Sequence, residues 1–391
     1  MKNRLPWLRL LMLWLAGVDL RVTLVAIPPL FPLIHRDLPL NETLVAVLLG
    51  LPVLLLATAS ILGSMLTTWL DARRAVILGI AVVGVSSAMR GIGPSLAMLF
   101  GMTLVMGMGV ALFQPALPAL VYHWTPEHIG LATAIYTNGL LAGEVMGAGL
   151  TTQALLPLAG SWQMSLALWG IFPLATLVLI WALTAPLQRR EAPAHRQWWP
   201  NFRDPKTWRL GIIQSGTSLV FWGANAFFPD FLHRAGSTHL IAPALVWLSA
   251  GQMLASLMVA IMPGLLVGRA RPIQLAAVVA GIGLAIFFIP RDWSRLLGAG
   301  LMGTFSALAF VLNLAFPPLL AADSDEVHRI SAGMFTIGYS ATFLFTLACG
   351  ALWDRTGIAA TALAPVALGV IFLLIGPCGL DNVSHRVQLR P

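Results

Sequence analysis

The stretch from Val145 to Gln188 contains no Asp, Glu, Lys or Arg. A helix crosses roughly 30 Å of hydrocarbon with about 20 apolar residues, so this stretch has room for two crossings, divided at the turn Pro157–Trp162. The whole chain is 58% hydrophobic and 10% charged, with a mean hydropathy of +0.85, whereas soluble domains are about 25% charged. Because backbone groups in lipid must be hydrogen-bonded internally, the sequence predicts an all-α polytopic membrane protein.

Pro, Gly and charged residues divide the chain into twelve stretches long enough to cross a membrane. They are residues 7–33, 43–70, 75–92, 95–122, 128–153, 162–185, 208–233, 239–266, 272–290, 293–319, 329–350 and 358–378. The only long polar segment separates the first six from the last six. We therefore predict an N-terminal six-helix bundle (1–186), a central loop (187–209) and a C-terminal six-helix bundle (210–391).

The net charge of +8 is distributed unevenly over the two sides of this arrangement. With both termini on one side, sixteen Lys and Arg residues fall on that side and six on the other. The six are Arg36, Arg90, Arg234, Arg291, Arg295 and Arg355. Such a bias marks the cytoplasmic side of a bacterial inner-membrane protein. We therefore predict cytoplasmic termini, and we attribute the basicity to topology among membrane lipids rather than to nucleic acid.

The two halves repeat one another weakly. A shift of 199 residues places 131–139 (LATAIYTNG) on 330–338 (ISAGMFTIG), and it places Gln114 on Asn313. A shift of 200 places Pro29 on Pro229. Parallel six-helix repeats about an axis along the membrane normal predict a cavity between the halves. Such twin halves are the major facilitator architecture.

Within that architecture the chain resembles the family of cyanate permeases and 2-nitroimidazole transporters. Four stretches carry the resemblance: DLRVTLVAIPPLFPLI (19–34), ETLVAVLLGLPVLLLA (42–57), LPALVYHWTPEHIGLATAIYT (117–137) and ISAGMFTIGYSATFLFTLACGALWDRTG (330–357). The first is the most specific, since the family has Asn or Thr, then Leu-Arg, then Pro or Val there. Leu20, Arg21 and Val22 match this pattern, whereas Asp19 departs from it, as does Glu144 where relatives have a small residue.

Arg21 is the main candidate for solute binding. It lies near the middle of the apolar stretch Trp7–Leu33, too deep to reach either interface, so it must face protein or a water-filled cavity. A guanidinium has a permanent charge and a planar fork of donors, which suits the oxygen pair of a carboxylate or nitro group, or a small anion such as cyanate. The alternative is an ion pair with Asp19 or Glu144 that only joins helices.

Two carboxyl groups are candidates for coupling transport to protons. Asp19 is two residues from Arg21, about 200° around a helix, so we expect it to face a neighbouring helix. Glu144 stands among Gly139, Gly143 and Gly147, a spacing that lets helices approach closely. Three roles are open for Glu144: proton carrier, counter-ion of Arg21, and neutral acid hydrogen-bonded in packing.

Neutral polar and aromatic residues complete the candidate site. Gln114 and Asn313 hold equivalent places in the two halves, and Asn225, Tyr339 and Trp222 lie in later spans. Each either contacts solute or forms hydrogen bonds between helices. His123 and His128 have no third ligand nearby in the sequence, so no metal site and no cofactor are expected.

These features predict a monomeric secondary transporter of a small anionic or nitro-bearing organic solute, working by alternating access in the inner membrane. The chain has no GxxxxGK[ST] segment for ATP and no constellation that would make it an enzyme. A channel fits twin halves less well than alternating access does. The alternative within transporters is proton-coupled efflux of hydrophobic or cationic drugs, with Asp19 and Glu144 as its evidence.

Overall fold

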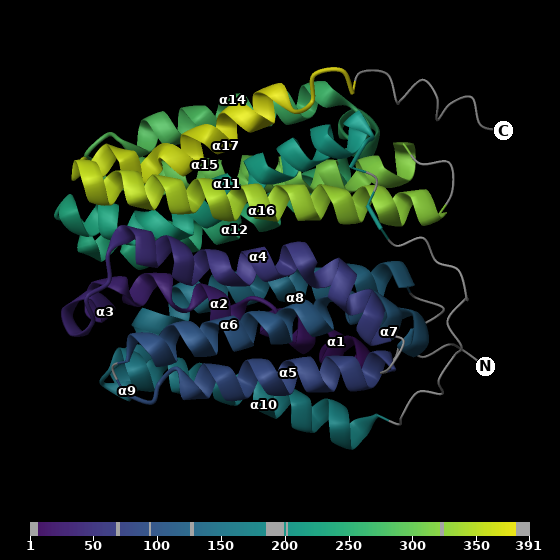
Figure 1. Ribbon diagram of the computed structural model, residues 1–391, viewed down its shortest axis with the longest axis horizontal. Coiled ribbons are helices and arrows are strands. Elements are labelled where there is room, and N and C mark those ends of the chain that lie inside the picture. The colour runs from purple at the N-terminus through teal and green to yellow at the C-terminus, as the bar shows by residue number, and fades with distance from the viewer. Residues whose placement is uncertain are drawn as a thin grey trace. The chain divides into compact units, whose positions relative to one another are not determined.

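The computed structural model describes residues 7–67, 71–93, 95–125, 129–184, 199–200, 202–320 and 324–380. The termini 1–6 and 381–391 and most of the predicted central loop, 185–198, lie outside the described residues. Within the described ranges every regular element is a helix and none is a strand (Figure 1). Eight of these helices are long and apolar enough to cross a membrane by length and composition. The all-helical membrane prediction is confirmed, and each of the twelve predicted stretches contains helix.

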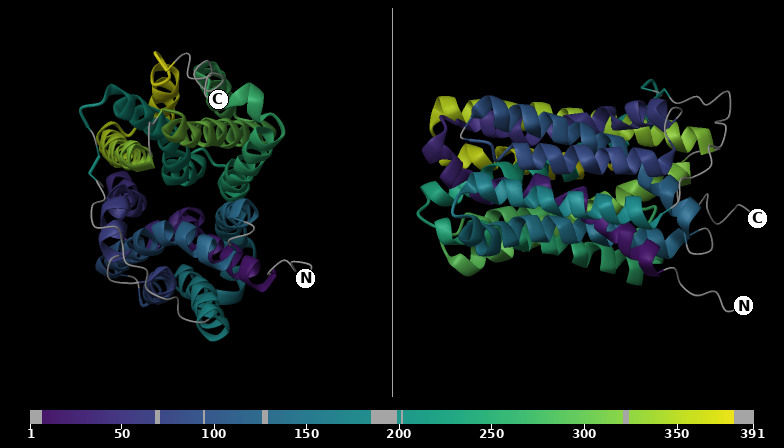
Figure 2. Two further views of the ribbon diagram at one scale, coloured as in Figure 1. Left: turned by 90° about the vertical axis from the view of Figure 1, so that its right-hand side faces the viewer. Right: turned by 90° about the horizontal axis from the view of Figure 1, so that it is seen from below.

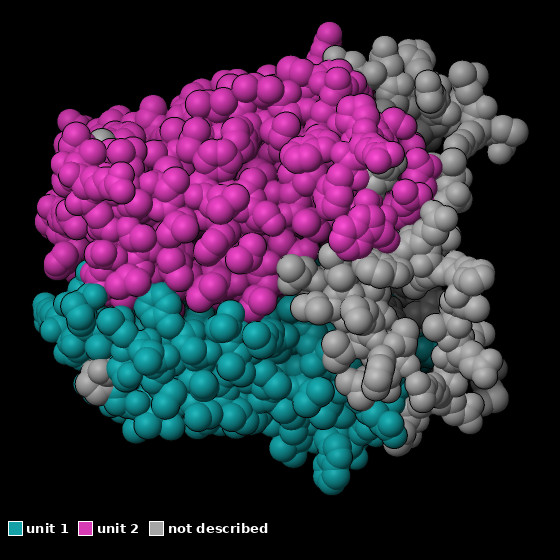
Figure 3. Space-filling view, in the orientation of Figure 1, with its two compact units in different colours: residues 1–39, 58–194 teal, residues 40–57, 195–391 magenta. Residues whose placement is uncertain are grey.

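The chain forms two compact units, which Figure 3 shows in different colours. Unit 1 comprises residues 1–39 and 58–194, and unit 2 comprises residues 40–57 and 195–391. The long helix α4 (Glu42–Thr67) is therefore divided, because its first part packs within unit 2 although it belongs to the N-terminal half of the sequence. Within each unit the long helices run alongside one another, as the end-on view in Figure 2 shows.

The remaining helices follow in chain order. Unit 1 contains α1 (Trp7–Asp19), α2 (Val22–Val25), η1 (Pro28–Leu30), α3 (Phe31–Asp37), α5 (Ala72–Met89), α6 (Leu96–Phe113), η2 (Gln114–Ala116), α7 (Leu117–Trp124), α8 (Ile129–Leu150), η4 (Thr151–Leu155), α9 (Leu156–Ala159) and α10 (Trp162–Leu183). Unit 2 contains α11 (Pro205–Arg234), η5 (Thr238–Leu240), α12 (Ile241–Ile261), α13 (Pro263–Leu266), α14 (Ala270–Phe287), α15 (Asp292–Leu320), α16 (Ser324–Thr356), η6 (Ala359–Leu363) and α17 (Ala364–Ile375).

Side-chain caps fix where several of these helices begin. Asp71 accepts the amide of Arg74 at the start of α5 (2.9 Å), and Ser161 accepts the amide of Met164 at the start of α10 (3.2 Å). Such caps satisfy amides that have no partner in the first turn of a helix. Gly160, with φ +71°, ends α9 in the left-handed conformation that glycine adopts without strain.

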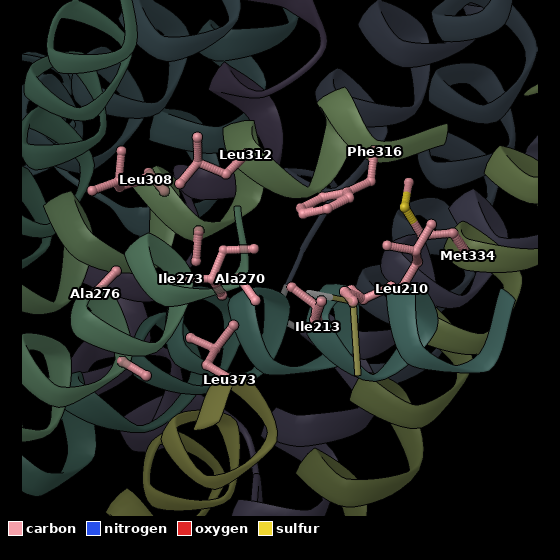
Figure 4. Packing of buried hydrophobic residues seen from close by; sticks show 14 of the residues in the cluster. Leu210, Ile213, Ala270, Ile273, Ala276, Leu308, Leu312, Phe316, Met334 and Leu373 are labelled. Carbon is pink, nitrogen blue, oxygen red and sulfur yellow. The ribbon is translucent and has the colours of Figure 1, made fainter. Parts of the chain in front are cut away.

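Unit 2 has a continuous apolar core. It includes Leu210 and Ile213 of α11, Ile273 of α14, Phe316 of α15 and Leu373 of α17, all fully buried (Figure 4). The close-up shows side chains from different helices directed toward one another around α11. α11 thus runs through the centre of its unit, and it is the counterpart of α1 in the sequence repeat.

Candidate functional site

The first transmembrane helix is interrupted at the predicted solute-binding residue. α1 ends at Asp19 and the single turn α2 begins at Val22. Between them the amides of Leu20 and Arg21 turn back to the carbonyls of Gly17 and Val18, both at 3.1 Å. Arg21 has a non-helical backbone (φ −127°, ψ −33°). Interrupted helices in the middle of a membrane are where transporters commonly bind solutes and ions.

Arg21 lies against Glu144 of α8. The Arg21 Nε and Glu144 Oε1 atoms are 3.5 Å apart, and the two side chains are only 8% and 3% exposed. The distance matches the counter-ion interpretation of Glu144. An opposite charge within reach lowers the cost of holding the Arg21 guanidinium inside the membrane.

Glycines bring α8 close enough for this ion pair. A Cβ atom added at Gly143 would lie 2.5 Å from the Val18 carbonyl oxygen, and one at Gly147 would lie 2.7 Å from that of Val22. No side chain fits at these distances, so the two backbones touch. The close approach predicted from the glycine spacing is confirmed.

Asp19 is fully buried. It interacts with the Thr176 hydroxyl of α10, but neither carboxyl oxygen is within hydrogen-bond geometry of any described residue. Thr176 donates instead to the carbonyl oxygen of Phe172 (3.2 Å). The expectation that Asp19 faces a neighbouring helix agrees with this contact.

The equivalent residues Gln114 and Asn313 have different surroundings. Gln114 begins the short 3₁₀ turn η2, and its buried Oε1 atom has no hydrogen-bond partner among the described residues. Asn313 is fully buried in unit 2, and its Nδ2 atom is 3.2 Å from the Leu210 carbonyl oxygen and 3.4 Å from Gln214 Oε1. Asn313 thus joins α15 to α11, which is the second of the two roles considered for it, hydrogen bonding between helices.

The other predicted contacts in unit 2 are also buried. Asn225 donates to the Phe221 carbonyl oxygen of its own helix (2.9 Å), and the ring of Trp222 meets that of Phe221 edge to face, with centroids 5.2 Å apart. Tyr339 stacks on Phe335 at 5.7 Å. Their packing is therefore defined, while their contact with solute stays a prediction.

Two polar clusters were not foreseen from the sequence. Arg90 and Arg295, counted from the sequence only as charges on the non-cytoplasmic side, are 0% and 6% exposed, so both guanidinium groups are buried within their units. The signal for Arg90 was Ser87, one helical turn earlier, which supplies a hydroxyl 2.9 Å from Arg90 Nη2.

The second cluster is at the start of α4 in unit 2. The Asp354 carboxylate accepts the amides of Glu42 and Thr43, each at 2.9 Å. Arg234 Nη2 is 2.8 Å from Glu42 Oε1, and its guanidinium lies 4.7 Å from the centre of the Trp353 ring. The helices α4, α11 and α16 are thus joined at one end.

Two helical units with a buried arginine at an interrupted helix define a polytopic membrane transporter. The sequence profile of the Major Facilitator Superfamily matches residues 10–327, and the chain belongs to this superfamily. It is accordingly a transporter that works by alternating access, and not an enzyme.

Similar proteins agree with this assignment. The chain is 26% identical over 390 residues to the cyanate transport protein CynX of Escherichia coli, covering 94% of this chain and 97% of that one. It is also 26% identical over 382 residues to the 2-nitroimidazole transporter of the same organism, covering 93% and 92%.

Two solved structures share the fold. The nucleoside transporter NupG superposes with a TM-score of 0.74 at 11% identity, covering 96% of this chain and 98% of that one. A bacterial homologue of the human lysosomal transporter Spinster gives 0.69 at 16% identity, covering 97% and 96%. At these identities the likeness concerns the fold alone.

Proposed function

We propose that this transporter carries a small anionic or nitro-bearing organic solute that binds at Arg21. The observation that carries the proposal is the buried Arg21–Glu144 pair (3.5 Å) at an interrupted helix. An arginine in the membrane interior is costly and is kept where it has a function. Relatives similar over nearly the whole chain are a cyanate transporter and a 2-nitroimidazole transporter, whose solutes carry oxygens or charge that a guanidinium binds well.

Binding would proceed by exchange of partners. A solute anion would take the place of the Glu144 carboxylate beside the Arg21 guanidinium, so the buried positive charge would always have a counter-ion. The displaced Glu144 carboxylate would then be a buried charge without its partner, which favours uptake of a proton. One proton would therefore accompany each solute anion, and transport would be an electroneutral symport.

A solute screen on the purified protein tests the first part of this proposal. We expect cyanate or 2-nitroimidazole to raise the melting temperature, whereas cationic drugs should not. A ligand present at 100 times its dissociation constant stabilises by about 2.7 kcal/mol, which is readily measured. Stabilisation by cationic drugs alone would contradict the proposal and support drug efflux instead.

The Glu144→Gln variant tests the second part. We expect it to lose uptake driven by a pH gradient and to keep exchange of solute across the membrane, because exchange needs no net proton movement. If Glu144 is only a fixed counter-ion, the variant should instead lose stability, by about 3–5 kcal/mol. Full gradient-driven uptake by a stable variant would assign coupling to another group, with Asp19 as the remaining candidate.

We also propose that the chain lies in a bacterial inner membrane as a monomer, with both termini and the 187–209 loop cytoplasmic. The support for the membrane orientation is the distribution of Lys and Arg along the sequence. Single cysteines at Ala194 and Ser237, in a background without Cys349 and Cys378, provide the test. An impermeant thiol reagent added to intact cells should label the second position only, and labelling at Ala194 would reverse the topology.

A further inference from the structure

Arg90, at the end of α5, is a buried charge that solute binding at Arg21 does not explain by itself. It is 0% exposed, and its Nη2 atom donates to the Thr23 carbonyl oxygen (3.0 Å) and to the Ser87 hydroxyl (2.9 Å). Ser87 in turn donates to the Leu166 carbonyl oxygen of α10 (3.1 Å). A guanidinium held this far from water requires a specific partner, and here that partner belongs to the first transmembrane helix.

The Thr23 carbonyl needs such a donor because the helix around it is interrupted. α2 is a single turn, and no backbone amide of the described residues bonds to the Thr23 oxygen. In a continuous helix the amide of Ile27, four residues later, would donate to this carbonyl, but α2 ends at Val25 and no such bond forms. In hydrocarbon an unpaired carbonyl is costly, and interrupted helices are tolerated only where other groups satisfy the freed backbone. Arg90 is the group that satisfies Thr23.

The same turn holds Arg21. The amides of Leu24 and Val25 donate to the Arg21 carbonyl oxygen, at 3.1 and 3.0 Å, so Arg21 and the turn α2 form one hydrogen-bonded segment. α8 packs against this segment through Gly147, and α5 holds it through Arg90. The orientation of Arg21 therefore depends on both contacts.

We propose that Arg90 is a positioning residue for solute binding: by holding the Thr23 carbonyl, it fixes the one-turn segment that presents Arg21. The inference rests on the proposed function, in which Arg21 binds the solute. It assigns Arg90 no contact with the solute itself, so its effect must pass through Arg21.

Arg73, at the other end of the same helix, is a matched control. It is 6% exposed and also donates to one carbonyl and one hydroxyl, those of Trp181 (2.9 Å) and Thr184 (2.7 Å). Both partners lie at the end of α10, away from α2. Arg73→Met and Arg90→Met thus remove the same kinds of bond from one helix, and only the second removes a bond to the interrupted segment.

The first measurement needs no solute. Hydrogen exchange of a peptide covering residues 20–27 should become faster in Arg90→Met and stay unchanged in Arg73→Met. Arg90→Lys, whose ammonium can still donate to the Thr23 carbonyl, should keep much of the protection of this peptide against exchange. It keeps the experiment informative if Arg90→Met does not fold. Unchanged exchange in Arg90→Met would overturn the inference.

The second measurement is the affinity for cyanate by thermal-shift titration. Arg90→Met should weaken binding about tenfold, a size typical of coupled neighbouring residues, and Arg73→Met should leave it unchanged. In an Arg21→Lys background, Arg90→Met should have little further effect, since both substitutions disturb one contact. If Arg90→Met instead weakened cyanate binding by the same factor in the Arg21→Lys background as in the wild type, the positioning role would be overturned. If exchange responds as expected while the wild type binds neither cyanate nor 2-nitroimidazole, the proposed function fails and the structural role of Arg90 stands.

Discussion

The first helix of each half has the same place in the repeat but a different course. The first transmembrane stretch is divided into α1, α2, η1 and α3 between Trp7 and Asp37, whereas α11 runs unbroken from Pro205 to Arg234. Both carry proline near the same end, yet α11 continues through Pro229 without a break. Proline alone therefore does not explain the interruption of the first helix.

Charge distinguishes the two helices. In the first, Asp19 and Arg21 lie at the interruption, while in α11 the ionisable residues lie only near the two ends. With the shift that places Pro29 on Pro229, Arg21 falls on Phe221, which packs against Trp222. α11, whose centre is apolar or neutral, stays regular. The first helix carries Arg21 at its centre and is interrupted there, and the Thr23 carbonyl left without a backbone partner accepts a hydrogen bond from Arg90. The two halves therefore have equivalent helices, but only the first half has charged side chains at the centre of its first helix.

The largest expected effect comes from substituting Arg21, the residue that distinguishes the first helix from α11. Arg21→Ala should weaken solute binding by about 2–5 kcal/mol, roughly thirty-fold or more, because it removes the buried guanidinium that would pair with the solute anion. Arg21→Lys should also weaken binding, since lysine keeps the charge but loses the planar fork. Phe221→Leu, at the equivalent place in α11, should leave binding unchanged.

The cyanate affinity of all three variants is measured by thermal-shift titration. A loss in Phe221→Leu equal to that in Arg21→Ala would show that the two halves contribute alike. Normal binding by Arg21→Ala would remove the proposed site.

The second effect concerns the close glycine contact between the interrupted helix and α8. Gly147→Ala should destabilise the protein by about 1–3 kcal/mol, the usual cost of overpacking, because its Cβ would lie 2.7 Å from the Val22 carbonyl oxygen. The matched change is Gly101→Ala in α6, where a Cβ meets nothing within 4 Å. That variant should be neutral or slightly stabilising. Melting temperatures in detergent give both values, and similar losses would mean that the close contact contributes little.

Much of this arrangement could be predicted from the sequence, because it depends on local composition. Long apolar stretches and their breaks predicted the helices, and the depth of Arg21 indicated a buried site. The interruption at Leu20 and Arg21 was not predicted, since neither residue is a helix breaker and the turn depends on contacts with α5 and α8. The role of Arg90 was missed for the same reason: the sequence showed only a charge near the end of the stretch 75–92, and its burial depends on the freed carbonyl of Thr23, 67 residues earlier in the chain.

The third effect concerns Asp354, near the end of α16, which caps the start of α4. Asp354→Ala removes the carboxylate that accepts the Glu42 and Thr43 amides, and loss of such a cap costs about 1 kcal/mol. We expect faster hydrogen exchange at the start of α4 and no change in solute affinity, in contrast to the variants of Arg21. A large loss of affinity in Asp354→Ala would mean that the contact between α16 and the start of α4 influences solute binding at Arg21.

The smallest effect separates Gln114 from Asn313, which hold equivalent places in the repeat. Asn313 bonds to α11 within the core of unit 2, so Asn313→Ala should lower stability by about 0.6 kcal/mol, a usual value for a hydrogen bond between transmembrane helices. Gln114 Oε1 has no partner among the described residues, so Gln114→Ala removes no such bond and should leave stability unchanged. If Gln114 contacts solute, its variant should instead weaken binding. Melting temperature and cyanate affinity are measured for both variants. A loss of stability in Gln114→Ala with normal cyanate binding would show that both residues have a structural role.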